Sequence, residues 1–146
     1  MWLRLPAEES SFEAGKIIAQ AALSLGRKAV VLGSTDLTHY GAAYGFSPMG
    51  SGRRALQWVR EQNDRAFIEA VEKGDPADVL GRAEKDQSAC SSGAVLGALG
   101  FAQERGAGPA RLLAYGTSID TLHEAGDASA KNADSFVGYA AMAMSN

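Results

Sequence analysis

Cysteine is nearly missing from this chain, which has one, Cys90, among 146 residues. A single thiol excludes an internal disulfide and a cysteine-rich zinc module, because both need several cysteines. The scarcity fits a reducing compartment. A secretory signal pattern is also missing from the N-terminus, and no apolar run approaches the ~18 residues of a membrane helix. We therefore expect a cytoplasmic protein with no membrane partner.

An excess of basic residues is missing too. The chain carries 14 Lys and Arg against 17 Asp and Glu, a formal net charge of −3, and the two signs are interleaved. Nucleic-acid binding relies on a basic stripe that neutralises phosphates, so we expect no nucleic-acid partner. The remaining composition, 46% hydrophobic and 21% charged, is typical of a globular protein. The length favours a single domain over residues 1–146.

The apolar pattern predicts an α/β fold. Ala29-Val30-Val31-Leu32 is a continuous apolar run, typical of a strand that is covered on both faces. Residues 135–144 are apolar on both sides and predict a second central strand, and residues 2–5 and 111–115 predict further strands. Helical periodicity runs from Ser10 or Ser11 to Gly26, over 54–73, from Asp75-Pro76 onward, and from Val95 to near Gly106. We expect a mixed sheet with helices on both faces.

The first helix has an apolar stripe at Phe12, Ile17, Ile18, Ala21, Ala22 and Leu25, which predicts its inner face. The long helix over 54–73 should end at Gly74. The late stretch 116–134 is polar and without periodicity, so it predicts a loop. His123 lies in that stretch and is expected to be a solvated surface residue.

A polar loop, "GSTDLTHYG", follows the apolar run 29–32 and contains Asp36 and His39 three positions apart. In open α/β sheets, ligands bind beyond the carboxyl ends of strands. The carboxylate could orient the imidazole for catalysis, or both side chains could hold one metal ion. The alternative is a helix-capping Asp and a His that is hydrogen-bonded within the core.

Cys90 stands in "SACSSG", at a predicted loop-to-helix junction where free backbone N–H groups favour a thiolate. It could be a metal ligand, a nucleophile paired with His39, or a small buried hydrophobe. Ser34, His39 and Asp36 also form a hydrolase set by residue type. However, the Gly-x-Ser-x-Gly elbow is missing and the three lie within six residues, which hinders a linear relay.

Three blocks of sequence follow one another along the chain: "GSTDLTHYG", "ACSSGAVLGAL", and "LLAYGTSID" followed by "SFVGYAAMAM". Together they resemble the Memo family, whose fold is similar to that of class III extradiol dioxygenases of the LigB type. The first block resembles the family's Ser-(Ser/Thr)-Asp-x-(Ser/Thr/Cys)-His-(Tyr/Trp)-Gly loop. The second resembles its Cys-Gly-x-(Gly/His)-Pro-Ile segment, with Ala94 where Pro is usual. The third resembles its last two strands.

The resemblance implies that Asp36, His39 and Cys90 line a metal pocket. Cys90 matches a direct ligand, and Asp36 and His39 match neighbours that contact metal or substrate. Iron or copper would suit this donor mixture. The family's two other ligand histidines belong to an N-terminal half that has no counterpart here, so residue 1 is expected to match the middle of a family member.

Several expectations follow from that match. The chain should associate with itself or with a complementary N-terminal half, and alone it should hold little metal and show no dioxygenase activity. A further protein partner is implied by the family's association with radical-SAM and AMMECR-type proteins. The main alternative is a non-catalytic interaction module with a degenerate site. A Cys90–His39 hydrolase is a third hypothesis.

Overall fold

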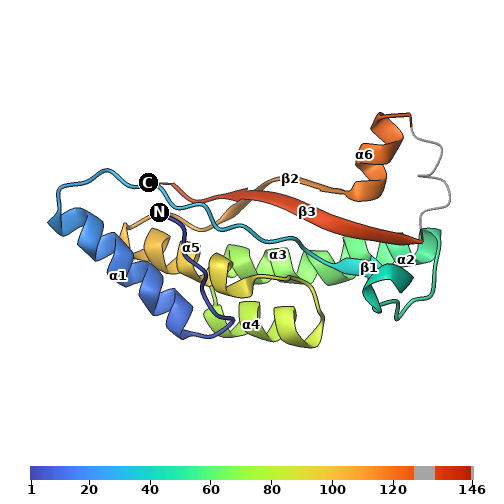
Figure 1. Cartoon of the computed structure of the whole chain (residues 1–146), viewed down its shortest axis with the longest axis horizontal. Helices are drawn as coiled ribbons and strands as arrows, with labels where there is room; N and C mark the ends of the chain where they lie inside the picture. Colours follow the sequence, from blue (N-terminus) through green and yellow to red (C-terminus); the bar gives the residue numbers. More distant parts are fainter. Residues whose placement is uncertain (127–133, 146) are drawn as a thin grey trace.

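Three antiparallel strands form the sheet on which the helices are arranged (Figure 1). The structure, a computed structural model, describes residues 1–126 and 134–145. The strands are β1 (His39–Gly41), β2 (Arg111–Thr117) and β3 (Ser135–Ala143), in the order β1-β3-β2. The predicted α/β class is confirmed, and β3 is the central strand, as its sequence predicts. Both strand pairs among the described residues are antiparallel, where a mixed sheet was expected.

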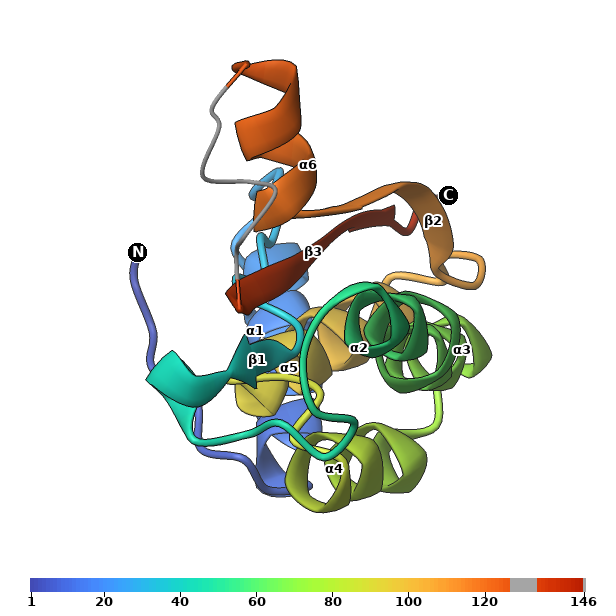
Figure 2. The ribbon, with the colours of Figure 1, turned by 90° about the vertical axis from the view of Figure 1, so that its right-hand side faces the viewer.

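Helices α1 to α5 lie on one side of the sheet and α6 lies on the other (Figures 1 and 2). They are α1 (Ser10–Ser24), α2 (Arg53–Trp58), α3 (Asp64–Lys73), α4 (Pro76–Lys85), α5 (Ser92–Glu104) and α6 (Ser118–Glu124), with a 3-10 turn at Ala42–Tyr44. A π-helical turn, Val59–Asn63, joins α2 to α3. The predicted helix over 54–73 is therefore one continuous helix whose middle is π-helical. Among the described residues, no helix combines the length and apolarity needed to cross a membrane.

Local sequence signals explain where several helices begin and end. Gly74 ends α3 with a left-handed φ of 69°, as predicted. The Asp75 carboxylate accepts hydrogen bonds from two N–H groups of the first turn of α4. Helix α6 was not expected, because its polar sequence has no apolar stripe; a capping box between Thr117 and Asp120 starts it. Residues 127–133 of the predicted polar loop lie outside the described residues.

Helices α1 and α5 approach so closely that glycine is required between them. A methyl group added at Gly15 would overlap the carbonyl oxygen of Gly97, and one at Gly100 would overlap that of Phe12. The buried face of α1 is therefore Ser11, Phe12, Gly15 and Ala19. The predicted inner stripe of α1 was wrong at three of its six positions: Ala21 is exposed, Ile17 is 63% exposed and Leu25 is 71% exposed. Close backbone contact, rather than side-chain size, selects the buried face.

The residues before and after β1 are anchored by an aromatic cluster. The Tyr40 ring is fully buried and stacks on Phe136 with centroids 5.1 Å apart. Its hydroxyl donates to the Gly50 carbonyl at 2.9 Å and accepts from the Met49 N–H at 3.0 Å. These contacts fold the glycine-rich loop 41–53 back against β1, so the polar loop that precedes β1 has a fixed end.

The prediction that Ala29–Leu32 is a covered strand was wrong for the described residues. This segment is extended but belongs to no strand, and Val30 and Leu32 are 96% and 90% exposed. Its apolar sequence meets the local requirement for a strand, yet no described residue pairs with it. The short strand predicted at residues 2–5 is likewise not formed, and Trp2 is exposed.

Candidate metal centre

Two loops bring the predicted site residues together. Asp36 and His39 come from the segment that enters β1, and Cys90 comes from the loop that enters α5, 51 positions after His39. A carboxylate oxygen, an imidazole nitrogen and the thiol sulfur lie within 4.8 Å of one another. Within residues 1–126 and 134–145, no other set of three His, Cys, Asp or Glu side chains gathers in this way. The predicted convergence is therefore observed.

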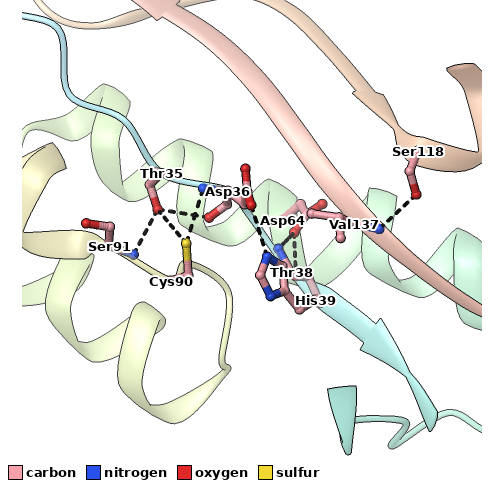
Figure 3. Close-up of polar contacts among 9 residues, drawn as sticks. All are labelled: Thr35, Asp36, Thr38, His39, Asp64, Cys90, Ser91, Ser118 and Val137. Atoms are coloured by element: carbon pink, nitrogen blue, oxygen red, sulfur yellow. Dashed lines mark hydrogen bonds and ion pairs between the residues drawn. The ribbon is translucent and has the colours of Figure 1, made fainter. Parts of the chain in front are cut away.

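Hydrogen bonds tie the two loops to each other (Figure 3). The Cys90 N–H donates to the Asp36 carbonyl at 3.2 Å, and the Asp36 N–H points to the Cys90 sulfur at 3.4 Å. The hydroxyl of Thr35 accepts from the Ser91 N–H at 2.9 Å and lies 3.7 Å from the same sulfur. The thiol is thus held beside the carboxylate by backbone groups, and it stays exposed to solvent.

His39 is oriented by a carboxylate and an aromatic ring. Its Nε2 lies 3.2 Å from Asp36 Oδ2. The ring of Tyr44 lies 4.9 Å from the imidazole, centroid to centroid, at a tilt of 40°. Burial raises the pKa of the Tyr139 phenol, and the negative charge of Asp36 and the Tyr44 phenol raise it further. Neither tyrosine was assigned to the site from the sequence, although Tyr139 lies in the block "SFVGYAAMAM" that resembles the family.

A buried carboxylate beneath the site holds the backbone next to His39. Asp64 is fully buried and accepts hydrogen bonds from the Thr38 N–H at 3.0 Å and from the Thr38 hydroxyl. The Tyr115 hydroxyl donates to its other oxygen at 2.7 Å. Burial raises the pKa of Asp64, although these hydrogen bonds oppose the rise. Gly138 faces the same carboxylate so closely that a methyl group there would overlap it.

The π-helical turn explains how Asp64 reaches this position. Asn63 ends the turn and is buried beside Asp64; its amide donates to the Thr38 hydroxyl and to the Asp86 carbonyl, both at 2.9 Å. Two consecutive helical residues thus contact one threonine. Turns of this kind are rare and concentrate near functional sites. The sequence gives no signal for the turn, so this support network could not be predicted.

The donor set suits a transition-metal ion. Imidazole nitrogen, thiolate sulfur and carboxylate oxygen bind such ions at ~2.0–2.3 Å. The three observed donors lie within reach of one ion after small rotations of side chains that are partly or fully exposed. Asp36 and His39 can alternatively act as a carboxylate–imidazole pair, because their contact is already made.

The other predicted arrangements receive less support. Ser34 is exposed and makes no hydrogen bond to His39 among the described residues. Cys90 contacts Thr35 and Asp36, and no hydrogen bond joins it to His39 in the described part of the chain. His123 is exposed on α6, as predicted. Only Asp36, His39 and Cys90 share one location.

Comparisons with known proteins match nearly the whole chain. The family model described as Memo-like protein matches residues 1–143. The chain is 32% identical over 141 residues to a MEMO1 family protein of Thermococcus onnurineus. That match covers 96% of this chain and 46% of the relative. The chain is also 32% identical over 146 residues to a MEMO1 family protein of Pyrococcus furiosus, with 97% and 46% covered. A relative in Methanothermobacter thermautotrophicus is 32% identical over 141 residues.

The chain spans about half the length of the curated relatives it matches, since 46% of the first three is covered. The match reaches from the first residue to the end of β3 and contains all three residues of the candidate metal centre. The chain therefore belongs to the family of Memo-like proteins.

Proposed function

We propose that this chain forms one wall of a metal-binding pocket in a Memo-type domain related to class III extradiol dioxygenases. The observation that carries the proposal is the gathering of Asp36, His39 and Cys90, three donors of different chemistry, within 4.8 Å. Two of them come from one loop and the third from a loop tied to it by backbone hydrogen bonds. Cys90 is the proposed thiolate ligand.

Iron or copper is the proposed ion, because a mixed nitrogen, oxygen and sulfur set suits redox-active metals. When bound, such an ion would supply Lewis-acid and one-electron chemistry. The chain's own part is to hold the donors. Asp36 fixes the tautomer and orientation of the His39 imidazole. Asp64 fixes the backbone of Thr38, which joins directly to His39.

Completion of the pocket is proposed to need a second wall. Stable transition-metal sites usually have three or four well-oriented protein ligands and supporting hydrogen bonds. Here all three donors are partly or fully exposed, so solvent competes at the open side. The relatives are about twice as long as the matched region, and we propose that the remaining part of a Memo-type domain supplies the second wall.

Metal content measured by elemental analysis tests this proposal. The chain alone should retain little iron, copper or zinc after dialysis against a chelator. Mixed with the part of a Memo-type relative that has no match in this chain, it should retain metal close to one ion per complex. Cys90→Ala should lower the affinity of the mixture for metal at least tenfold, because it removes the strongest donor.

His123→Ala is the matched control, since His123 is exposed and distant in sequence from the centre. It should leave the metal content of the mixture unchanged. Near-stoichiometric metal in the isolated chain that survives the chelator would contradict the need for a second wall. Unchanged affinity in Cys90→Ala would contradict the ligand assignment and favour a non-catalytic interaction module.

A further inference from the structure

An apolar groove of about 670 Å³ leads to the candidate metal centre. One wall is the extended segment 29–33, and the opposite wall is the second half of β3 with the residues after it, 140–145. The floor comes mainly from α5 and α3, with Val95, Leu99, Phe67 and Val71 among its residues. The groove reaches Thr35 and Leu37, on either side of Asp36, so one of its ends adjoins the metal centre.

In residues 1–126 and 134–145, neither wall of the groove is paired with another backbone segment on the groove side. Backbone groups of successive strand residues point to opposite edges. The N–H of Gly138 bonds to the Thr38 carbonyl and its C=O accepts from the Leu37 N–H, so both backbone groups point to the edge of β3 away from β2. Ala140 and Met142 lie two and four residues further along, so their N–H and C=O groups point to that same edge. Beyond Gly138, the described residues place no strand on this edge.

The other wall is equally open. In the part of the chain that the structure describes, no backbone–backbone hydrogen bond joins residues 29–33 to another segment. Val30 and Leu32 are almost wholly exposed, although their sequence is typical of a strand buried on both faces. Natural sequences rarely place such a run in water without a covering partner.

We infer that this groove is the seat of one inserted β-strand, supplied by the remaining part of a Memo-type domain. The inference rests on the proposed function, since that same part is proposed to complete the metal pocket. An inserted strand would pair with both walls and cover the apolar floor with its side chains. Residues 29–33 span ~16 Å at ~3.3 Å per residue, the length of an ordinary short strand.

Two features favour this occupant over others. A lipid or another small apolar molecule would fill the floor but leave the backbone groups of both walls unpaired, whereas a strand satisfies them. A second copy of the chain would bring the same three donors and no new wall. The relatives carry more than half of their length outside the region that matches this chain, and the groove opens beside Asp36, where the second wall is needed.

The test mixes the chain with the part of the Thermococcus onnurineus relative that lies outside the matched region, with a chelator present. The matched part of that relative, mixed with its own other part, is the positive control. We expect a one-to-one complex by sedimentation velocity. Amide hydrogen exchange at residues 29–33 and 140–144 should slow at least tenfold in the complex.

Two variants locate the contact. Ala102→Phe places a large ring on the groove floor, and Val31→Pro removes a backbone donor from a segment that makes no backbone bond in the chain alone. Each should weaken the complex at least tenfold while the circular dichroism of the isolated chain stays the same. Ala77→Phe is the matched control, because Ala77 is exposed on α4 away from the groove; it should bind as the unchanged chain does.

Four results would overturn the inference: association of the positive control without association of this chain, unchanged exchange at both walls, full binding by both groove variants, or protection of the walls by self-association or by a co-purified apolar molecule seen in native mass spectrometry. Because the chelator removes metal, a complex that forms normally and later fails to bind metal supports the strand and contradicts only the proposed function.

Discussion

The two sides of α5 differ in how closely the rest of the chain packs against them. Toward α1, the helix presents Gly100, where an added methyl group would overlap the backbone of Phe12, and the Gly97 carbonyl, which lies directly against Gly15 of α1. Toward the groove, it presents Val95, Ala98 and Ala102, which are half-buried and line the open groove. Both sides are apolar in sequence, and an all-round apolar helix is usually buried. The difference teaches that only one side of α5 finds its cover within the described chain.

Disrupting the contact between α1 and α5 should have the largest effect on the free energy of unfolding. In Gly100→Ala, the added methyl group meets the backbone of Phe12, which cannot rotate away, so α1 and α5 must separate. We expect a loss of about 3–5 kcal/mol in the free energy of unfolding, measured by urea denaturation. Gly81→Ala is the matched control, because Gly81 is exposed on α4 with nothing near it; it should gain up to ~1 kcal/mol. Equal stability of the two variants would refute the close-packing account.

The buried Asp64 should produce the next largest effect. Asp64→Ala leaves the Thr38 N–H and the Tyr115 hydroxyl without their buried acceptor, which should cost about 2–4 kcal/mol. Asp64→Asn keeps an acceptor for Thr38 and carries no charge, so it should lose much less at pH 7. Thermal and urea unfolding of the two variants measure the difference.

The pH dependence of stability gives the sign of the Asp64 effect. Burial raises the pKa of Asp64, so the folded chain holds this proton more tightly than the unfolded chain. Between the ordinary carboxyl pKa and the raised value, the free energy of unfolding should therefore decrease as pH rises. Asp64→Asn should remove this slope. An unchanged slope in Asp64→Asn would assign it to other carboxyl groups.

A substitution in the exposed segment 29–33, which faces the groove side of α5, should give the smallest change in stability. In Leu32→Ser, an almost wholly exposed side chain is replaced, so the free energy of unfolding should shift by less than ~0.5 kcal/mol. The same change should weaken the complex proposed for the groove, because it removes an apolar side chain from one wall. Sedimentation velocity of the mixture and urea denaturation of the chain alone separate the two effects. A loss of several kcal/mol would show that the segment is already covered.

Local signals in the sequence predicted most of the helices and the strand β3, because caps and periodicity act over a few residues. They also predicted that Asp36, His39 and Cys90 would meet, through the resemblance of two short blocks. They did not predict the glycine contact of α1 with α5, the helix α6 or the Asp64 network, since each depends on a tertiary neighbour. The error at 29–32 has the same origin: a strand also needs a neighbouring strand to pair with, and no described segment bonds to these residues through its backbone.

The π-helical turn Val59–Asn63 also restricts how the length of its helix can vary. Residues before it, such as Ala55 and Leu56, pack in the Tyr40 cluster, and residues after it, such as Asp64 and Phe67, pack beneath Thr38 and in the main core. One α-helical residue turns the chain by ~100°. A single deletion at the exposed Glu61 would turn the π-helical turn into regular α-helix. It would also rotate one set of buried residues away from its partners. Glu61, a surface residue whose carboxylate accepts a hydrogen bond from Gln57, is thereby as intolerant of deletion as a core residue is of substitution.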